Sequence, residues 1–151
     1  MSYSKNLLNL VCEPFYMKKF IISGLAAGAV ILVLWNVVGL IFGMFGFSVS
    51  ALAGMRNFND PIMMLYFLYP FVFGFALAYL YPLVEGKIKG DIVSKGFAFG
   101  MIMFTINAIP SAYLNLTSMN YPFAFTAMTI IGPLVYLPAA GIAVAWASKL
   151  K

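Results

Sequence analysis

The sequence predicts an all-α membrane protein with four transmembrane helices arranged as two helical hairpins. Of its 151 residues, 64% are hydrophobic and only 9% are charged, whereas charged residues make up about a quarter of an ordinary soluble domain. Four apolar runs are each long enough for the roughly 20 residues that a helix needs to cross about 30 Å of hydrocarbon. Little chain lies outside these runs, so we expect one membrane domain over residues 1–151.

The first span is expected over residues 20–45, after the leader Met1–Lys19. Apolar residues recur in the leader at near-helical spacing, which suits either a short interfacial helix or a frayed terminus. The apolar run that follows is much longer than the roughly 7–15 residues of a signal-peptide core, so we interpret it as an uncleaved helix. The connection Gly46–Asp60 is expected to be an outer loop, with a short interfacial or re-entrant helix as the alternative.

The second span is expected over residues 61–84 and opens with Asp60-Pro61, where proline suits a first helical turn. Pro70 removes a backbone donor inside this run, which predicts a kink between Tyr66 and Pro70. A charged segment, residues 85–95, follows and is interpreted as the hinge loop between the hairpins. Within it, Glu85 with Lys89, and Asp91 with Lys95, have the spacing of weak helical ion pairs.

The third and fourth spans are expected over residues 96–117 and 123–147, joined by a tight turn that ends at Tyr121-Pro122. Pro110 falls inside the third run, and two further prolines, Pro133 and Pro138, interrupt the fourth. A proline within a membrane helix either frames a cavity or fits the helix to its neighbours. Both interpretations stay open.

The distribution of basic residues predicts the orientation in the cell membrane. Eight lysines fall on one side of the four spans, and only Arg56 falls on the other; the lysines are Lys5, Lys18, Lys19, Lys87, Lys89, Lys95, Lys149 and Lys151. Basic residues in short loops mark the cytoplasmic side. Both termini should therefore be cytoplasmic.

Small residues recur at helical spacing on the first and third spans. The pattern Gly-x-x-x-Gly occurs three times in these spans, at Gly24 and Gly28, at Gly39 and Gly43, and at Gly96 and Gly100. Lipid tails give no hydrophobic drive for helix association, so glycines that let backbones approach become a main source of packing. The glycines could close the bundle of one chain or form an interface between chains.

The two halves of the chain also resemble each other in sequence. Gly24, Gly28 and Trp35 on the first span have the spacing of Gly96, Gly100 and Asn107 on the third. Because both halves would run in the same direction, they could be parallel repeats related by an axis along the membrane normal. Pairing Lys19 with Lys95 instead shifts the match by about one turn, so the register stays open.

A neutral polar stripe is the candidate ligand site. It comprises Asn107, Ser111 and Asn115 along the third span, with Asn36 on the first and Tyr66 and Tyr69 on the second; Thr126 and Thr129 add hydroxyls on the fourth. If these side chains converge, they form an outward-facing pocket suited to an uncharged or lipidic ligand. They could equally hydrogen-bond across helices, at about 0.6 kcal/mol each, and hold the bundle together.

Several classes of function are disfavoured. No Asp, Glu, Lys or Arg lies inside the four runs, and such residues usually mark proton relays and ion coupling. There is no histidine, and Cys12 is the only cysteine, so we expect no metal site and no cofactor. The formal charge of +5 is explained by orientation rather than by nucleic-acid binding.

These observations favour a non-catalytic protein over an enzyme. The leading hypothesis is an accessory or scaffold subunit that packs through its small-residue faces, either as a homo-oligomer or in a larger membrane complex. The alternative is a small transporter or channel for a neutral or lipid-like solute, with the polar stripe lining its path. Membrane lipids are partners in both cases.

Overall fold

The computed structural model describes residues 14–47 and 59–150. This part of the chain is all-helical, and four of its helices are long and apolar enough to span a membrane, at Met17–Met44, Pro61–Lys87, Ile92–Ser118 and Phe123–Ala147. The prediction of four such helices is confirmed. The expectations for most of the leader, and for most of the Gly46–Asp60 connection with Arg56, lie outside the described residues.

Helix α2 is longer than the sequence predicts. It runs over Pro14–Met44, so it begins before Lys18 and Lys19 rather than after them. A proline at the first helical position lacks only an N–H that would have no partner there. Lysine side chains can extend from a helix end toward the membrane surface, so the two lysines need not end the helix.

The second span has two parts, a 3₁₀ segment η2 over Pro61–Leu68 and helix α3 over Tyr69–Val84. A kink was expected between Tyr66 and Pro70, and a change of helix type is found there. An α-helix through this point would place the Pro70 ring against the Tyr66 carbonyl. Instead, the Tyr69 N–H donates to that carbonyl in the tighter 3₁₀ pattern.

The hinge loop is shorter than predicted. A short 3₁₀ turn, η3 at Glu85–Lys87, is followed by helix α4 over Ile92–Ser118, which begins before the expected residue 96. Asp91 starts α4 early because its Oδ1 accepts a hydrogen bond from the Ser94 N–H at 3.3 Å. Hydrogen bonds from the Ser94 side chain and backbone hold the pKa of Asp91 below its usual value.

Chain reversal before α4 depends on Gly90. Its φ is +117°, in a region that residues other than glycine rarely adopt. Gly86, the other glycine of residues 85–95, does not have a positive φ.

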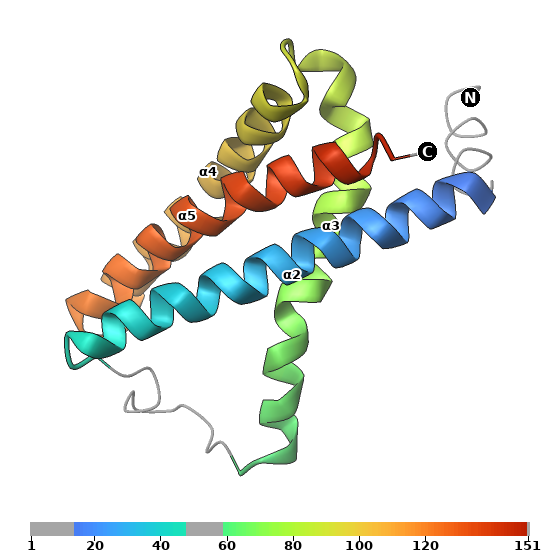
Figure 1. Ribbon diagram of the computed structural model, residues 1–151. Coiled ribbons are helices and arrows are strands. Elements are labelled where there is room, and N and C mark those ends of the chain that lie inside the picture. Colours follow the sequence, from blue (N-terminus) through green and yellow to red (C-terminus); the bar gives the residue numbers. More distant parts are fainter. Residues whose placement is uncertain (1–13, 48–58, 151) are drawn as a thin grey trace, which may run out of the picture.

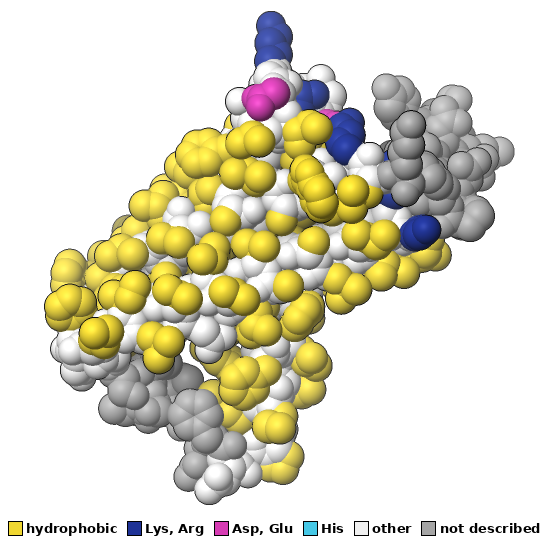
Figure 2. Space-filling model, viewed as in Figure 1, with side chains coloured by type: hydrophobic (Ala, Val, Ile, Leu, Met, Phe, Trp, Pro, Cys, Tyr) yellow, Lys and Arg dark blue, Asp and Glu magenta, His cyan; other side chains and the backbone are white. Residues whose placement is uncertain are grey.

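Charged side chains gather at the end of the bundle where α3 leads into α4. Glu85 accepts a hydrogen bond from Lys149 at 2.6 Å, so it pairs with the C-terminal segment rather than with Lys89. In Figure 2 the visible basic and acidic side chains lie toward this end and the start of α2, while the rest of the visible face is largely hydrophobic. An apolar exterior of this kind suits contact with lipid.

Helix α5, over Phe123–Ala147, lies at the centre of the packing. It packs against α4 and α2, and α2 in turn crosses α3 (Figure 1). The core lies between these helices and is made of fully buried side chains, the largest of which are Ile31, Leu77, Tyr81, Phe99, Leu137 and Val144.

Contact between α2 and α3 is made by glycine backbones. Gly74 of α3 faces Gly24 and Gly28 of α2, and a Cβ added at Gly74 would lie 2.5 Å from both the Gly24 carbonyl oxygen and the Gly28 nitrogen. No side chain fits in that space. The two helices therefore touch directly, as small-residue faces allow in membranes.

Contact between α4 and α5 has the same construction. Gly141 of α5 faces Gly96 and Gly100 of α4, and a Cβ at Gly96 or Gly100 would lie 2.5 Å from an α5 Cα atom. The two halves of the chain also match in register. Gly24 and Gly28 of α2 face Phe75 and Phe71 of α3. In the same order, Gly96 and Gly100 of α4 face Ile142 and Pro138 of α5. The structure thus favours the register that pairs Trp35 with Asn107 over the one that pairs Lys19 with Lys95.

The third glycine pair lies apart from these contacts. A Cβ at Gly39 would touch only the end of the Met128 side chain, at 3.9 Å, and one at Gly43 would meet nothing within 4 Å. Of the six glycines named from the sequence, four thus lie between helices of the described chain.

Gly74→Ala should destabilise the protein by about 1–3 kcal/mol, the usual effect of overpacking, because its new methyl group meets backbone on both sides. Gly43→Ala is the matched control and should be neutral or slightly stabilising, since alanine is the better helix former. Unfolding midpoints in a mild detergent measure both. Equal midpoints for the two variants would contradict the glycine contact.

Candidate functional site

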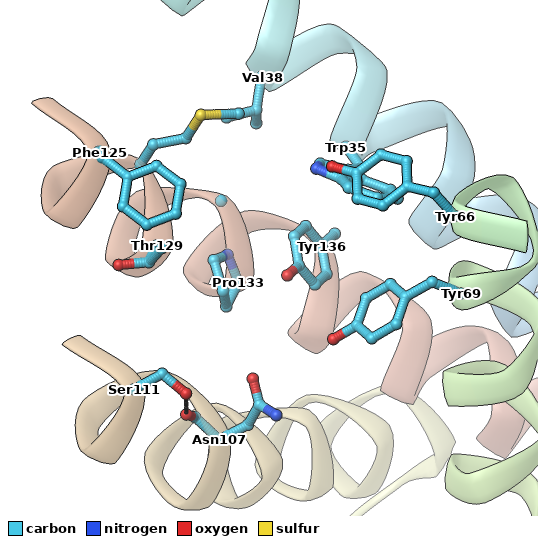
Figure 3. Close-up of a pocket in the computed structure, with 12 residues that line it drawn as sticks. Trp35, Val38, Tyr66, Tyr69, Asn107, Ser111, Phe125, Thr129, Pro133 and Tyr136 are labelled. Carbon is cyan, nitrogen blue, oxygen red and sulfur yellow. Dashed lines mark hydrogen bonds between the residues drawn. The ribbon is translucent and has the colours of Figure 1, made fainter. Parts of the chain in front are cut away.

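An interhelical cavity of about 240 Å³ lies between the start of the second span and helices α4 and α5, with α2 along one side. Twelve residues line it: Trp35, Val38, Tyr66, Tyr69, Asn107, Ser111, Phe125, Met128, Thr129, Gly132, Pro133 and Tyr136 (Figure 3). The lining is mostly apolar and none of these side chains carries a charge. Most of the polar groups come from tyrosine, asparagine, serine and threonine.

One wall is aromatic. The Trp35 ring of α2 lies 4.7 Å from the Tyr66 ring and 5.7 Å from the Tyr69 ring, measured between centroids. Residues three apart lie directly above one another in a 3₁₀-helix, so the winding of η2 brings both tyrosines to the same face of the span. Tilted and edge-on ring contacts of this kind each contribute about 0.5–1.5 kcal/mol beyond the area that they bury.

A polar wall is formed by Asn107, Tyr136 and the hydroxyl of Tyr69, whose ring also belongs to the aromatic wall. Tyr136 of α5 and Tyr69 direct their hydroxyls toward the centre of the cavity, where the Asn107 side-chain amide also lies (Figure 3). Ser111 donates its hydroxyl proton to the Asn107 backbone carbonyl at 2.7 Å. None of the hydrogen bonds among the described residues involves the Asn107 amide or the Tyr69 and Tyr136 hydroxyls.

These groups lie deep in the span. Asn107 is about three turns before the end of α4 at Ser118, roughly 16 Å along the helix axis, which is about half the thickness of the hydrocarbon. A polar group without a partner in such surroundings costs about 1–3 kcal/mol. Polar groups at this depth usually face a water-filled or ligand-filled space.

The filled core bounds the cavity toward one end of the bundle. Val38, Phe125 and Met128 line it on the side of the turn between α4 and α5. Toward the charged end, fully buried core side chains such as Leu77 and Leu137 fill the space between the helices. The described residues therefore form a pocket that the core bounds toward the charged end.

Four of the six candidate residues predicted from the sequence line the cavity: Tyr66, Tyr69, Asn107 and Ser111. Asn36 does not, because its side chain is exposed and donates to the Leu32 carbonyl at 2.7 Å. Asn115 lies outside the lining and donates to the Thr129 hydroxyl at 3.4 Å. The polar stripe thus serves two purposes, with one asparagine in the cavity and another joining α4 to α5.

Trp35 and Tyr136 were not predicted as lining residues, yet both form part of the cavity. The repeat could have identified them. Trp35 occupies the position of Asn107 in the other half, and Tyr69 precedes Gly74 by the same interval as Tyr136 precedes Gly141. Equivalent positions of the two halves therefore meet at the cavity.

The described residues offer no cluster of metal-ligating side chains. Within residues 14–47 and 59–150, no group of three His, Cys, Asp or Glu side chains could hold a metal ion. The cavity can offer hydrogen bonds, aromatic surface and apolar contact to a ligand.

The four apolar helices are compatible with a multi-pass membrane protein. No protein-family model, curated protein or solved structure matches the chain.

Asn107→Leu should stabilise the ligand-free protein by about 1 kcal/mol, because it removes an unpaired amide from apolar surroundings. Asn115→Leu is the matched control on the same helix and should cost about 0.6 kcal/mol, because it breaks a hydrogen bond between helices. Unfolding midpoints in a mild detergent separate the two. Destabilisation by both changes would show that Asn107 has a purely structural role.

Proposed function

We propose that this chain is a non-catalytic multi-pass membrane protein that binds an uncharged, amphiphilic solute in the interhelical cavity, as a small carrier or transporter would. One observation carries the proposal: three unpaired neutral polar groups, from Tyr69, Asn107 and Tyr136, point into one space near the middle of the span. A ligand with hydroxyl or carbonyl groups would supply the missing hydrogen bonds.

The chemistry of the lining favours binding over catalysis. Tyrosines are the only titratable residues among the twelve, and a tyrosine hydroxyl is a poor acid or base at neutral pH. A charged ligand would lose its hydration in the cavity without finding an opposite charge. An uncharged ligand has no such cost.

A second candidate is the accessory or scaffold role. It is favoured by the glycine pair Gly39 and Gly43, of which Gly39 is half-buried and Gly43 exposed, together with Leu40 and Met44, which are 70% and 86% exposed on the same end of α2. A partner helix could approach closely there. The other two glycine pairs are already occupied within the chain, so this role comes second. If the protein purified in mild detergent as a strict monomer with no co-purifying partner, that result would count against the scaffold role.

We also infer the orientation: two hairpins in the cell membrane, with both termini cytoplasmic. The lysines of the described residues support it: Lys95 lies near the start of α4, Lys149 pairs with Glu85 of the hinge loop, and the visible basic side chains of Figure 2 lie toward this end and the start of α2.

The ligand proposal can be tested with tryptophan fluorescence. The chain has two tryptophans, so Trp146→Phe leaves Trp35 as the reporter in the cavity wall. Monohexanoylglycerol, a soluble neutral amphiphile, should change this fluorescence saturably, and hexyl phosphate should not. Adding Tyr136→Phe should weaken binding roughly three- to tenfold, because one neutral hydrogen bond is lost.

Tyr113→Phe is the control for that experiment, since Tyr113 lies on α4 outside the cavity and is 67% exposed. It should leave the affinity unchanged. Absence of saturable binding, or equal weakening by both tyrosine changes, would contradict the proposal.

The orientation is tested by labelling intact cells with a membrane-impermeant maleimide after Cys12→Ser. Asn120→Cys, in the turn between α4 and α5, should react from outside. Lys89→Cys, in the hinge loop, should react only after the membrane is permeabilised. The opposite pattern would reverse the orientation.

A further inference from the structure

We propose that the ligand is a bilayer lipid with an uncharged, hydroxyl- or ester-bearing head, and that this head reaches the interhelical cavity sideways, between η2 and α4. This inference rests on the proposed function and narrows it to one class of ligand and one route. Capacity, opening and polarity of the cavity each support it.

The cavity is too small for a whole lipid. Ligand pockets that enclose a drug-sized molecule measure about 300–1,000 Å³, and a void of about 150 Å³ holds a single benzene. At about 240 Å³, the interhelical cavity has room for a small head group. The chains of a larger amphiphile must remain outside it.

An opening lies between η2 and α4. Only Met63 of η2 is buried, and η2 stands apart from α4 and α5 where the second span leaves the bundle (Figure 1). Tyr66 and Tyr69, on one side of the opening, are 37% and 43% exposed, so the cavity wall is continuous with the outer surface.

The surroundings of the opening suit acyl chains. Large exposed apolar side chains on η2 and α4 include Leu65, Leu68, Ile106 and Ile109. A lipid whose head occupied the cavity would keep its chains against these helices, in the hydrocarbon of the bilayer. The core bounds the cavity toward the charged end, and the partly exposed Tyr66 and Tyr69 side chains connect it with the surface at the side.

The polar wall selects the head. Asn107 can donate and accept hydrogen bonds, and so can the Tyr69 and Tyr136 hydroxyls, which suits a glycerol hydroxyl or an ester carbonyl. A phosphate or carboxylate would be buried without an opposite charge. Diacylglycerol therefore fits the cavity, and an anionic phospholipid does not.

Quenching of Trp35 by brominated lipids in bilayers tests the inference. The full-length Trp146→Phe variant is reconstituted in phosphatidylcholine nanodiscs with small amounts of diacylglycerol or phosphatidylglycerol that carry the same brominated chains. Brominated diacylglycerol should quench roughly tenfold more effectively, with saturation, because its head can satisfy the unpaired groups. Adding Asn107→Leu should remove most of this preference, whereas Asn115→Leu should retain it.

Equal, unsaturable quenching by the two lipids would overturn the inference. If monohexanoylglycerol still bound in detergent, the proposed function would stand and only the lipid and its route would be wrong. If neither compound bound, both proposals would fail.

Discussion

Everything in this structure depends on the direct backbone contacts made by Gly74 with Gly24 and Gly28, and by Gly141 with Gly96 and Gly100. In lipid, apolar side chains gain little by leaving the solvent for one another. Close packing therefore has to supply the attraction between helices. Dispersion forces fall quickly with distance, and the absent side chains let whole helices approach to contact.

The same contacts explain why a cavity forms where it does. Around the glycines, helices meet backbone to backbone and the core between them is filled. Beyond the crossing, the bulky rings of Trp35, Tyr66 and Tyr69 occupy the space between α2 and the second span. Small residues at one level and large ones at the next make the helices diverge. The separation between η2 and α4 then remains open beside Asn107.

Much of this arrangement could be predicted from the sequence. The four spans follow from the length of the apolar runs, and the break before Pro70 follows from the missing N–H of proline. The early start of α4 at Ile92 could not be predicted securely, because Asp91 was equally well placed for an ion pair with Lys95 as for capping the helix. A local cap and a local ion pair have similar sequence patterns and similar energies.

The site was harder to predict than the spans. Tyr66, Tyr69, Asn107 and Ser111 were identified because polar side chains are rare in apolar runs. Asn36 is also a polar residue in an apolar run, but its side chain hydrogen-bonds to a carbonyl of its own helix. Nothing in the sequence distinguishes this arrangement from one in which the side chain faces a neighbouring helix. Trp35 and Tyr136 were missed because aromatic residues are common in membrane helices. Only the packing of the two halves in matching register places them together.

The 3₁₀ winding of η2 also has a consequence for the thickness of the surrounding bilayer. At about 2.0 Å per residue, the eight residues of η2 span about 16 Å, and the 16 residues of α3 add about 24 Å. The second span thereby reaches about 40 Å, the length of the 27-residue α4. Rewinding η2 as an α-helix would shorten it by about 4 Å and rotate Tyr66 away from Tyr69. The winding of η2 therefore sets two things together, the length of the second span across the bilayer and the alignment of the two tyrosines in the aromatic wall.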